Sequence, residues 1–93
     1  MRITFDNAKR LKTLQERKLD FEDAPLVFAG FHYTDVDDRS DYGEDRFISV
    51  GQLYSDVVVL VWTERDDSRR IISMRKADRD ERGEYYEYLD RSG

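Results

Sequence analysis

Two patterns of apolar positions mark the start of the chain. Residues 2–5 alternate between polar and apolar side chains, which predicts a short strand at the edge of a sheet. Asp6, which follows, is a residue type that caps helix starts. Behind it, Ala8, Leu11 and Leu14 recur at helical spacing among charged residues. We therefore expect an amphipathic helix with one buried stripe after the first strand.

A second helix is predicted immediately after the first. Asp20 has the position of another N-cap, and Phe21 lies in the turn that follows it. Pro25 removes a backbone donor close to this start, so the helix should be brief. Gly30 marks its expected end.

Four segments with β patterning follow, at residues 32–36, 46–53, 57–62 and 69–75. The segment 57–62 is rich in β-branched side chains and is apolar on both faces, which is typical of a central strand that is covered on both sides. The last three segments are expected to form an antiparallel meander, because short turn sequences join them.

Strict alternation within the segment 69–75 would place Ile72 and Met74 on one face of the sheet. Ile71, Ser73 and Arg75 would then share the other face.

The chain should end in a third helix. Asp78 and Glu81 have the spacing of a capping box, and Tyr85 and Leu89 continue at helical spacing. Residues 1–93 therefore form one domain of the α+β class. We expect a mainly antiparallel sheet of three to four strands with two N-terminal helices and one C-terminal helix.

Composition limits the classes of function. Lys and Arg number 16 against 21 Asp and Glu, so the net charge is −5, which argues against binding nucleic acid by bulk attraction. The chain has no cysteine and hence no disulfide or thiolate metal site. It also lacks the apolar stretch of a signal peptide or a membrane span, so we expect a cytoplasmic location without a membrane partner.

An acidic segment at residues 35–45 contrasts with a basic second half. Metal binding there is disfavoured, because Arg39 stands where a calcium loop needs a third oxygen ligand. Docking of a basic partner would use this charge, and a solvated loop is the alternative.

Short blocks of sequence match the pattern of a known family in order and spacing. They are Phe5-Asp6-Asn7-Ala8-Lys9, Phe21-Glu22-Asp23-Ala24, Tyr42-Gly43-Glu44-Asp45-Arg46-Phe47, Gly51, Val61-Trp62-Thr63-Glu64-Arg65, Arg70-Ile71-Ile72-Ser73-Met74-Arg75-Lys76-Ala77, Glu81 and Tyr85. Each block alone is weak, but together they extend over nearly the whole chain. On these residues the chain resembles the BrnT family of type II toxins.

The resemblance implies a RelE-like fold and a metal-independent endoribonuclease, without a cofactor, whose cleavage of RNA arrests translation. It also implies a BrnA-type antitoxin that joins the toxin in a heterotetramer, and contact with operator DNA only through that antitoxin. Many family members carry Asn-x-x-x-His-Gly in the first helix and its exit. This chain has Thr13 and Arg17-Lys18 at those places, so no role for that histidine is carried over.

Candidate site residues follow from the chemistry of RNA cleavage, which needs a base for the 2′-hydroxyl, cations for the phosphorane and a proton donor. A pair of histidines is excluded, because His32 is the only one. Guanidinium and ammonium groups match phosphate oxygens. The expected phosphate-binding residues are Lys9, Arg46, Arg70 and Arg75; the candidate bases are Glu44 or Glu64, and the candidate acid is Tyr85.

Each candidate also has a structural interpretation. The arginines could pair with nearby carboxylates, Glu44 with Arg46 above all, while Lys9 could be merely solvated and Glu64 could belong to a plain turn. Tyr85 could pack in the core. If these interpretations hold throughout, the chain is a non-catalytic protein-binding module of the same fold.

Overall fold

The computed structural model describes residues 2–39 and 41–92. Its elements, in chain order, are β1 (Arg2–Phe5), α1 (Asn7–Arg17), the 3-10 helix η1 (Phe21–Asp23), α2 (Ala24–Ala29), β2 (His32–Val36), β3 (Arg46–Leu53), β4 (Asp56–Arg65), β5 (Ser68–Lys76) and α3 (Arg79–Ser92). The α+β class is as predicted. Among the described residues, no helix is both long and apolar enough to cross a membrane.

The sheet has five strands in the order β1-β5-β4-β3-β2. Strands β2 to β5 form an antiparallel meander, whereas β1 pairs with β5 in parallel. The predicted number of strands, three to four, was therefore too low, and the prediction did not include the parallel pairing of β1 with β5. The parallel pair joins the two ends of the sequence, and local patterning carries no information on such a distant partner.

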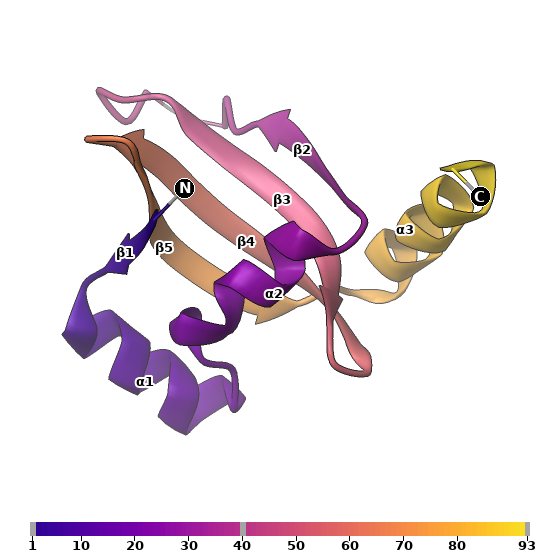
Figure 1. Cartoon of the computed structure of the whole chain (residues 1–93), viewed down its shortest axis with the longest axis horizontal. Helices are drawn as coiled ribbons and strands as arrows, with labels where there is room; N and C mark the ends of the chain where they lie inside the picture. Colours follow the sequence, from indigo (N-terminus) through magenta and orange to yellow (C-terminus); the bar gives the residue numbers. More distant parts are fainter. Residues whose placement is uncertain (1, 40, 93) are drawn as a thin grey trace.

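Strand β4 is central and covered on both faces, as predicted. Val58 and Leu60 belong to the larger apolar cluster, which also contains η1 and α2 residues. Val57 and Val59 belong to a second cluster with Tyr85 of α3. Figure 1 shows α2 crossing in front of the sheet and α3 extending away from it at the right. We call these the α2 face and the α3 face of the sheet.

A β-bulge interrupts β5. Val61 lies opposite Ser73 and Trp62 lies opposite Ile71, so Ile72 is an extra residue without a partner on β4. Ile71 and Met74 are consequently both buried in the α2-face cluster. The predicted alternation, with Ile72 and Met74 on one face, was wrong because it assumed a regular strand.

Helix α1 lies beside the sheet rather than on it, and none of its residues is buried. Leu11 is 51% exposed, so the predicted buried stripe was wrong. The helix lies beside β5, where β1 has ended (Figure 1), and Arg17 Nη1 donates to the Met74 carbonyl at 2.8 Å. An apolar stripe identifies an amphipathic helix, but it does not identify the surface that covers it.

The helix ends follow the predicted caps. Asp6 accepts a hydrogen bond from the Ala8 backbone, and Asp20 accepts one from Glu22. Asp78 and Glu81 exchange the two reciprocal bonds of a capping box, each at 2.8 Å. These caps fix where α1, η1 and α3 begin, and the last of them sets Glu81 beside the end of β5.

Candidate functional site

Four arginines of β3, β4 and β5 lie on the α3 face of the sheet. On β4, Thr63 and Arg65 are two residues apart and share this face with Val59. Residues opposite each other on neighbouring strands point to the same side, and the partners of Thr63 are Arg46 on β3 and Arg70 on β5. Arg75 lies opposite Val59. We call this set the arginine face: Arg46, Arg65, Arg70 and Arg75.

The bulge is what brings Arg70 and Arg75 to one face. The two residues are five positions apart, and in a regular strand an odd separation places side chains on opposite faces. The extra residue Ile72 shifts the alternation of side chains by one position, so Arg70 and Arg75 point to the same face. Three phosphate-binding residues predicted from the sequence therefore share one surface.

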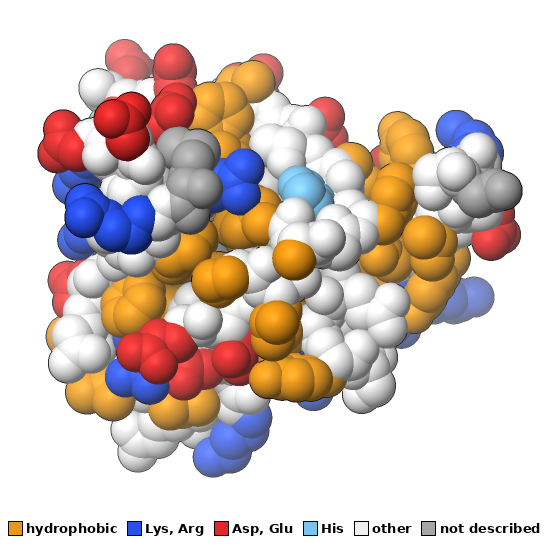
Figure 2. All heavy atoms as spheres, viewed as in Figure 1, with side chains coloured by type: hydrophobic (Ala, Val, Ile, Leu, Met, Phe, Trp, Pro, Cys, Tyr) orange, Lys and Arg blue, Asp and Glu red, His pale blue; other side chains and the backbone are white. Residues whose placement is uncertain are grey.

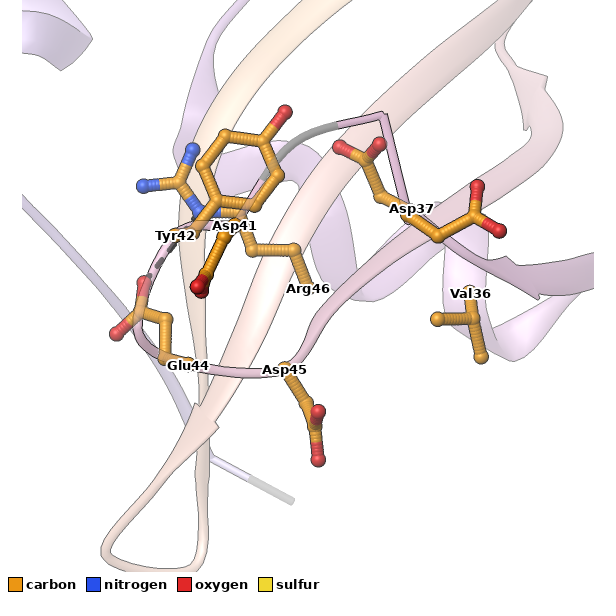
Figure 3. Close-up of a pocket in the computed structure, with 8 residues that line it drawn as sticks. Val36, Asp37, Asp41, Tyr42, Glu44, Asp45 and Arg46 are labelled. Carbon is orange, nitrogen blue, oxygen red and sulfur yellow. Dashed lines mark hydrogen bonds and ion pairs between the residues drawn. The ribbon is translucent and has the colours of Figure 1, made fainter.

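Glu44 lies between two of these cations. Its carboxylate is 3.4 Å from Arg46 Nε and 3.1 Å from Arg65 Nη2. The Tyr42 ring lies over the Arg46 guanidinium at 3.9 Å from its centroid, as Figure 3 shows. The predicted pairing of Glu44 with Arg46 is confirmed. Arg65 was not among the predicted site residues, although its spacing of two from Thr63 could have indicated it.

The hollow beside this group is acidic. It measures about 380 Å³ and is lined by Val36, Asp37, Asp38, Asp41, Tyr42, Glu44, Asp45 and Arg46. Asp37 is itself held by Arg39, whose Nε lies 2.7 Å from the carboxylate. One arginine among five carboxylates leaves this hollow unsuited to phosphate.

Arg75 is fully engaged by Glu81. Two nitrogens of its guanidinium donate to the two carboxylate oxygens at 2.7 and 2.8 Å. These hydrogen bonds lower the pKa of Glu81 to about 2. The link ties the start of α3 to the end of β5, and it occupies one of the predicted phosphate-binding residues.

Arg70 is the member of the arginine face without a carboxylate partner in the described part of the chain. Its strand neighbours on this side are the hydroxyl residues Thr63 on β4 and Thr4 on β1. A partly exposed guanidinium flanked by hydroxyl groups has donors available for a phosphate.

Lys9 lines a groove between α1 and β5. The groove measures about 190 Å³ and is lined by Lys9, Lys12, Thr13, Glu16, Arg17, Ile72 and Ser73. Three cations against one carboxylate make it positive, in contrast to the acidic hollow. Ser73 points to the arginine face, so the groove meets that face at the edge of β5. The sequence interpretation missed Lys12 and Arg17, which lie one and two turns after Lys9.

The groove also contains two of the three positions at which the chain departs from the pattern of the family that it resembles. Thr13 and Arg17 line it, and Arg17 stands where many members carry histidine. Lys18 has a φ of 60°, in the left-handed region that favours the glycine of the family pattern.

Two predicted residues lie elsewhere. Glu64 points to the α2 face and lies opposite Arg69 in the β4–β5 register. Together with Glu44 it lines a separate hollow at the strand ends. Tyr85 is 2% exposed and donates from its hydroxyl to the Phe31 carbonyl at 3.1 Å. Burial raises the pKa of Tyr85. The structure thus brings neither residue to the open part of the arginine face.

Comparison with known families gives one match. The sequence pattern of the family described as "Ribonuclease toxin, BrnT, of type II toxin-antitoxin system" matches residues 5–81. This range includes the whole arginine face, Glu44, Glu81 and the cations of the groove. No curated protein matched the chain.

Proposed function

Because this chain belongs to the BrnT family of ribonuclease toxins of type II toxin-antitoxin systems, we propose that it is a metal-independent endoribonuclease that cleaves RNA on the arginine face. Cleavage arrests translation in the cytoplasm, and a BrnA-type antitoxin holds the toxin silent in a heterotetramer, which contacts operator DNA through the antitoxin. The observation that carries the proposal is Arg70, a guanidinium with no carboxylate partner among the described residues, on a surface that also holds a carboxylate and further cations.

Arg70 is the group that binds the scissile phosphate. As the 2′-oxygen attacks phosphorus, negative charge builds on the phosphorane oxygens, and a guanidinium that is already in place stabilises this charge without reorganising. Removing one such donor typically lowers the rate by roughly 100- to 1,000-fold. Arg46 lies across Thr63 from Arg70, about 10 Å away for two strand spacings, which is far enough for it to contact a different phosphate of the same RNA.

Glu44 is the better placed of the two predicted bases. It lies beside Arg46 and Arg65 on the arginine face, whereas Glu64 points to the other side of the sheet. In the proposed reaction, Glu44 takes the 2′-hydroxyl proton and the 2′-oxygen bonds to phosphorus. The bond from phosphorus to the 5′-oxygen breaks, and that oxygen leaves with a proton from solvent, giving a 2′,3′-cyclic phosphate and a 5′-hydroxyl.

The groove of Lys9, Lys12 and Arg17 receives the RNA backbone beyond the cleaved bond. Its cations lie next to Ser73, at the margin of the arginine face. Local positive charge of this kind lets a molecule of net charge −5 bind a polyanion.

The proposal is tested by incubating the purified chain with end-labelled RNA in the presence of a chelator. We expect cleavage by the wild type, and a loss on the order of 100-fold in Arg70→Ala. Arg79→Ala is the matched control, because Arg79 is an exposed arginine of α3 outside the site, and it should cleave normally.

Absence of cleavage by the wild type would favour a non-catalytic binding module. Two observations support that alternative, the ion pair of Arg46 with Glu44 and the ion pair of Arg75 with Glu81. Equal cleavage by the wild type and Arg70→Ala would instead show that the reaction does not take place at Arg70 on the arginine face.

A further inference from the structure

The α2 face carries an aromatic surface that the proposed reaction does not use. Phe47 and Trp62 have ring centroids 4.8 Å apart, and Trp62 and Phe28 have centroids 5.7 Å apart. Val36, the register neighbour of Phe47 on β2, is 63% exposed. Figure 2 views this side and shows hydrophobic side chains gathered across it. We call these residues the aromatic surface: the exposed Val36, the half-buried Phe28 and Phe47, and Trp62, which is 8% exposed.

Arg69 lies against this surface. Its Cζ is 4.0 Å from the centroid of the Phe28 ring and 5.2 Å from that of Trp62. Its Nε is buried and has no hydrogen-bond partner among the described residues. Glu64 is opposite Arg69 in the register, yet the two form no ion pair in the described structure.

The interactions of Arg69 within the described structure are incomplete, because its guanidinium contacts aromatic rings but its Nε lacks an acceptor. The rings attract the guanidinium through their faces but accept no strong hydrogen bond from its edge. A buried donor that lacks an acceptor lowers the stability of the fold, so folding alone does not explain the arrangement. A planar cation whose outer nitrogens remain reachable is matched by a carboxylate or a phosphate.

The platform under Arg69 is fixed before any ligand arrives. Trp62 Nε1 donates to Ser49 Oγ at 2.8 Å, and Ser49 Oγ lies 2.7 Å from Thr34 Oγ1. Ser49 is fully buried. This chain of hydrogen bonds holds the indole ring in one orientation, and preorganisation of that kind favours binding.

The surrounding charge favours a carboxylate over nucleic acid. Glu64 lies beside Arg69, and Asp66 and Asp67 form the adjoining β4–β5 turn. Acidic side chains also border the upper left of this face in Figure 2. A polyanion would meet these carboxylates on either side of a single arginine, whereas one acidic side chain within an apolar protein segment would not.

We propose that Arg69 and the aromatic surface form a docking site for an apolar segment of the antitoxin, in which one carboxylate pairs with Arg69. The inference rests on the proposed function only in taking the antitoxin as the partner. It places this contact on the side of the sheet away from the arginine face. The antitoxin segment supplies apolar side chains to Val36 and Phe47, and its carboxylate accepts hydrogen bonds from the outer nitrogens of Arg69.

The test measures the affinity of the full chain for its cognate antitoxin by calorimetry, with wild type, Arg69→Met and the control Arg79→Met. Methionine keeps a long apolar side chain on the rings while it removes the charge. We expect Arg69→Met to weaken binding by at least roughly 30-fold and to shift the thermal midpoint by less than about 4 °C. Arg79→Met should bind as the wild type does.

A double-mutant cycle identifies the partner group. Each acidic residue of the antitoxin is changed to alanine against wild-type and Arg69→Met toxin, and one of them should lose its effect in the Arg69→Met background.

Unchanged antitoxin affinity in Arg69→Met overturns the inference. If that variant also loses RNA cleavage, the result would assign the surface to RNA instead. RNA cleavage by the free wild type is scored separately, so failure of the proposed function and failure of this docking site give different results.

Discussion

Ser49 sets the orientation of Trp62 through a buried hydrogen bond. Ser49→Ala would leave the indole N–H buried without an acceptor, and such an orphaned donor costs about 1–3 kcal/mol. We therefore expect the free energy of unfolding to fall by that amount in urea denaturation. Ser55→Ala, in an exposed turn, should change it by less than about 0.5 kcal/mol. Equal effects of the two variants would contradict the role given to Ser49.

Glu81 links stability to pH. Its ordinary pKa is 4.5, and hydrogen bonds from Arg75 hold it at about 2 in the folded chain. A carboxyl group with a depressed pKa stabilises the fold fully above its unfolded pKa, and this contribution is lost as pH falls through the folded value. We expect part of the stability to disappear between pH 4.5 and about pH 2, and Glu81→Gln to lack that part. Parallel pH profiles for the two proteins would exclude the linkage.

The same residue competes with RNA for Arg75. Both oxygens of Glu81 accept from the guanidinium, so a phosphate that binds Arg75 must displace them. If Arg75 contributes to RNA binding, Glu81→Gln should lower KM for the RNA substrate, because the amide neutralises less of the charge. The Glu84→Gln variant, at another exposed acidic position of α3, serves as the control. A higher KM in Glu81→Gln would mean that the pair positions Arg75 for the substrate.

At the scale of elements, the end of α1 offers a direct test. Lys18 adopts a φ of 60°, and this conformation costs a non-glycine residue roughly 1–2 kcal/mol. Lys18→Gly should therefore raise the free energy of unfolding by about 1 kcal/mol. Lys12→Gly, in the middle of the same helix, should lower it by about 1 kcal/mol. Urea denaturation of both variants checks the opposite signs, and destabilisation by Lys18→Gly would contradict the assignment of the cap.

Local signals in the sequence predicted most elements of this fold. The caps at Asp6 and Asp20, the brief helix that contains Pro25 and the doubly covered strand around Val59 all follow from residue type and spacing within a few positions. The parallel pairing of β1 with β5 does not, because it depends on contacts between the two ends of the chain.

The candidate site was harder to predict than the elements. Arg46 and Arg70 lie on different strands, so their common face depends on a register that the sequence does not state. Arg70 and Arg75 share a face because of the bulge at Ile72, and nothing in the sequence distinguishes this apolar residue from an ordinary strand residue. Tyr85 has the spacing of a core residue as much as that of a catalytic one, and only the structure shows that it is buried and donates to the Phe31 carbonyl.

At the scale of the whole molecule, charge is divided between two regions. The acidic hollow gathers the carboxylates of the β2–β3 connection, whereas seven of the 16 Lys and Arg side chains lie on the arginine face or in the groove between α1 and β5. In the proposed function, RNA approaches this protein of net charge −5 at the arginine face and the groove, away from the acidic hollow. This division explains how a negative protein could bind a negative substrate without a large basic surface.

The division of charge sets the salt dependence that we expect for RNA binding. A single-stranded nucleic acid releases counterions in proportion to the phosphates that a protein contacts, with a logarithmic slope of about −0.7 for each. If contacts are confined to about three phosphates, around Arg70, Arg46 and the groove, the slope of binding constant against salt should be roughly −2. Titration of a fluorescent, non-cleavable 2′-deoxy analogue of the RNA over a range of salt concentrations measures it. A slope near −6 would require a much larger basic surface than the one described, and a slope near zero would mean that phosphate contacts do not drive binding at all.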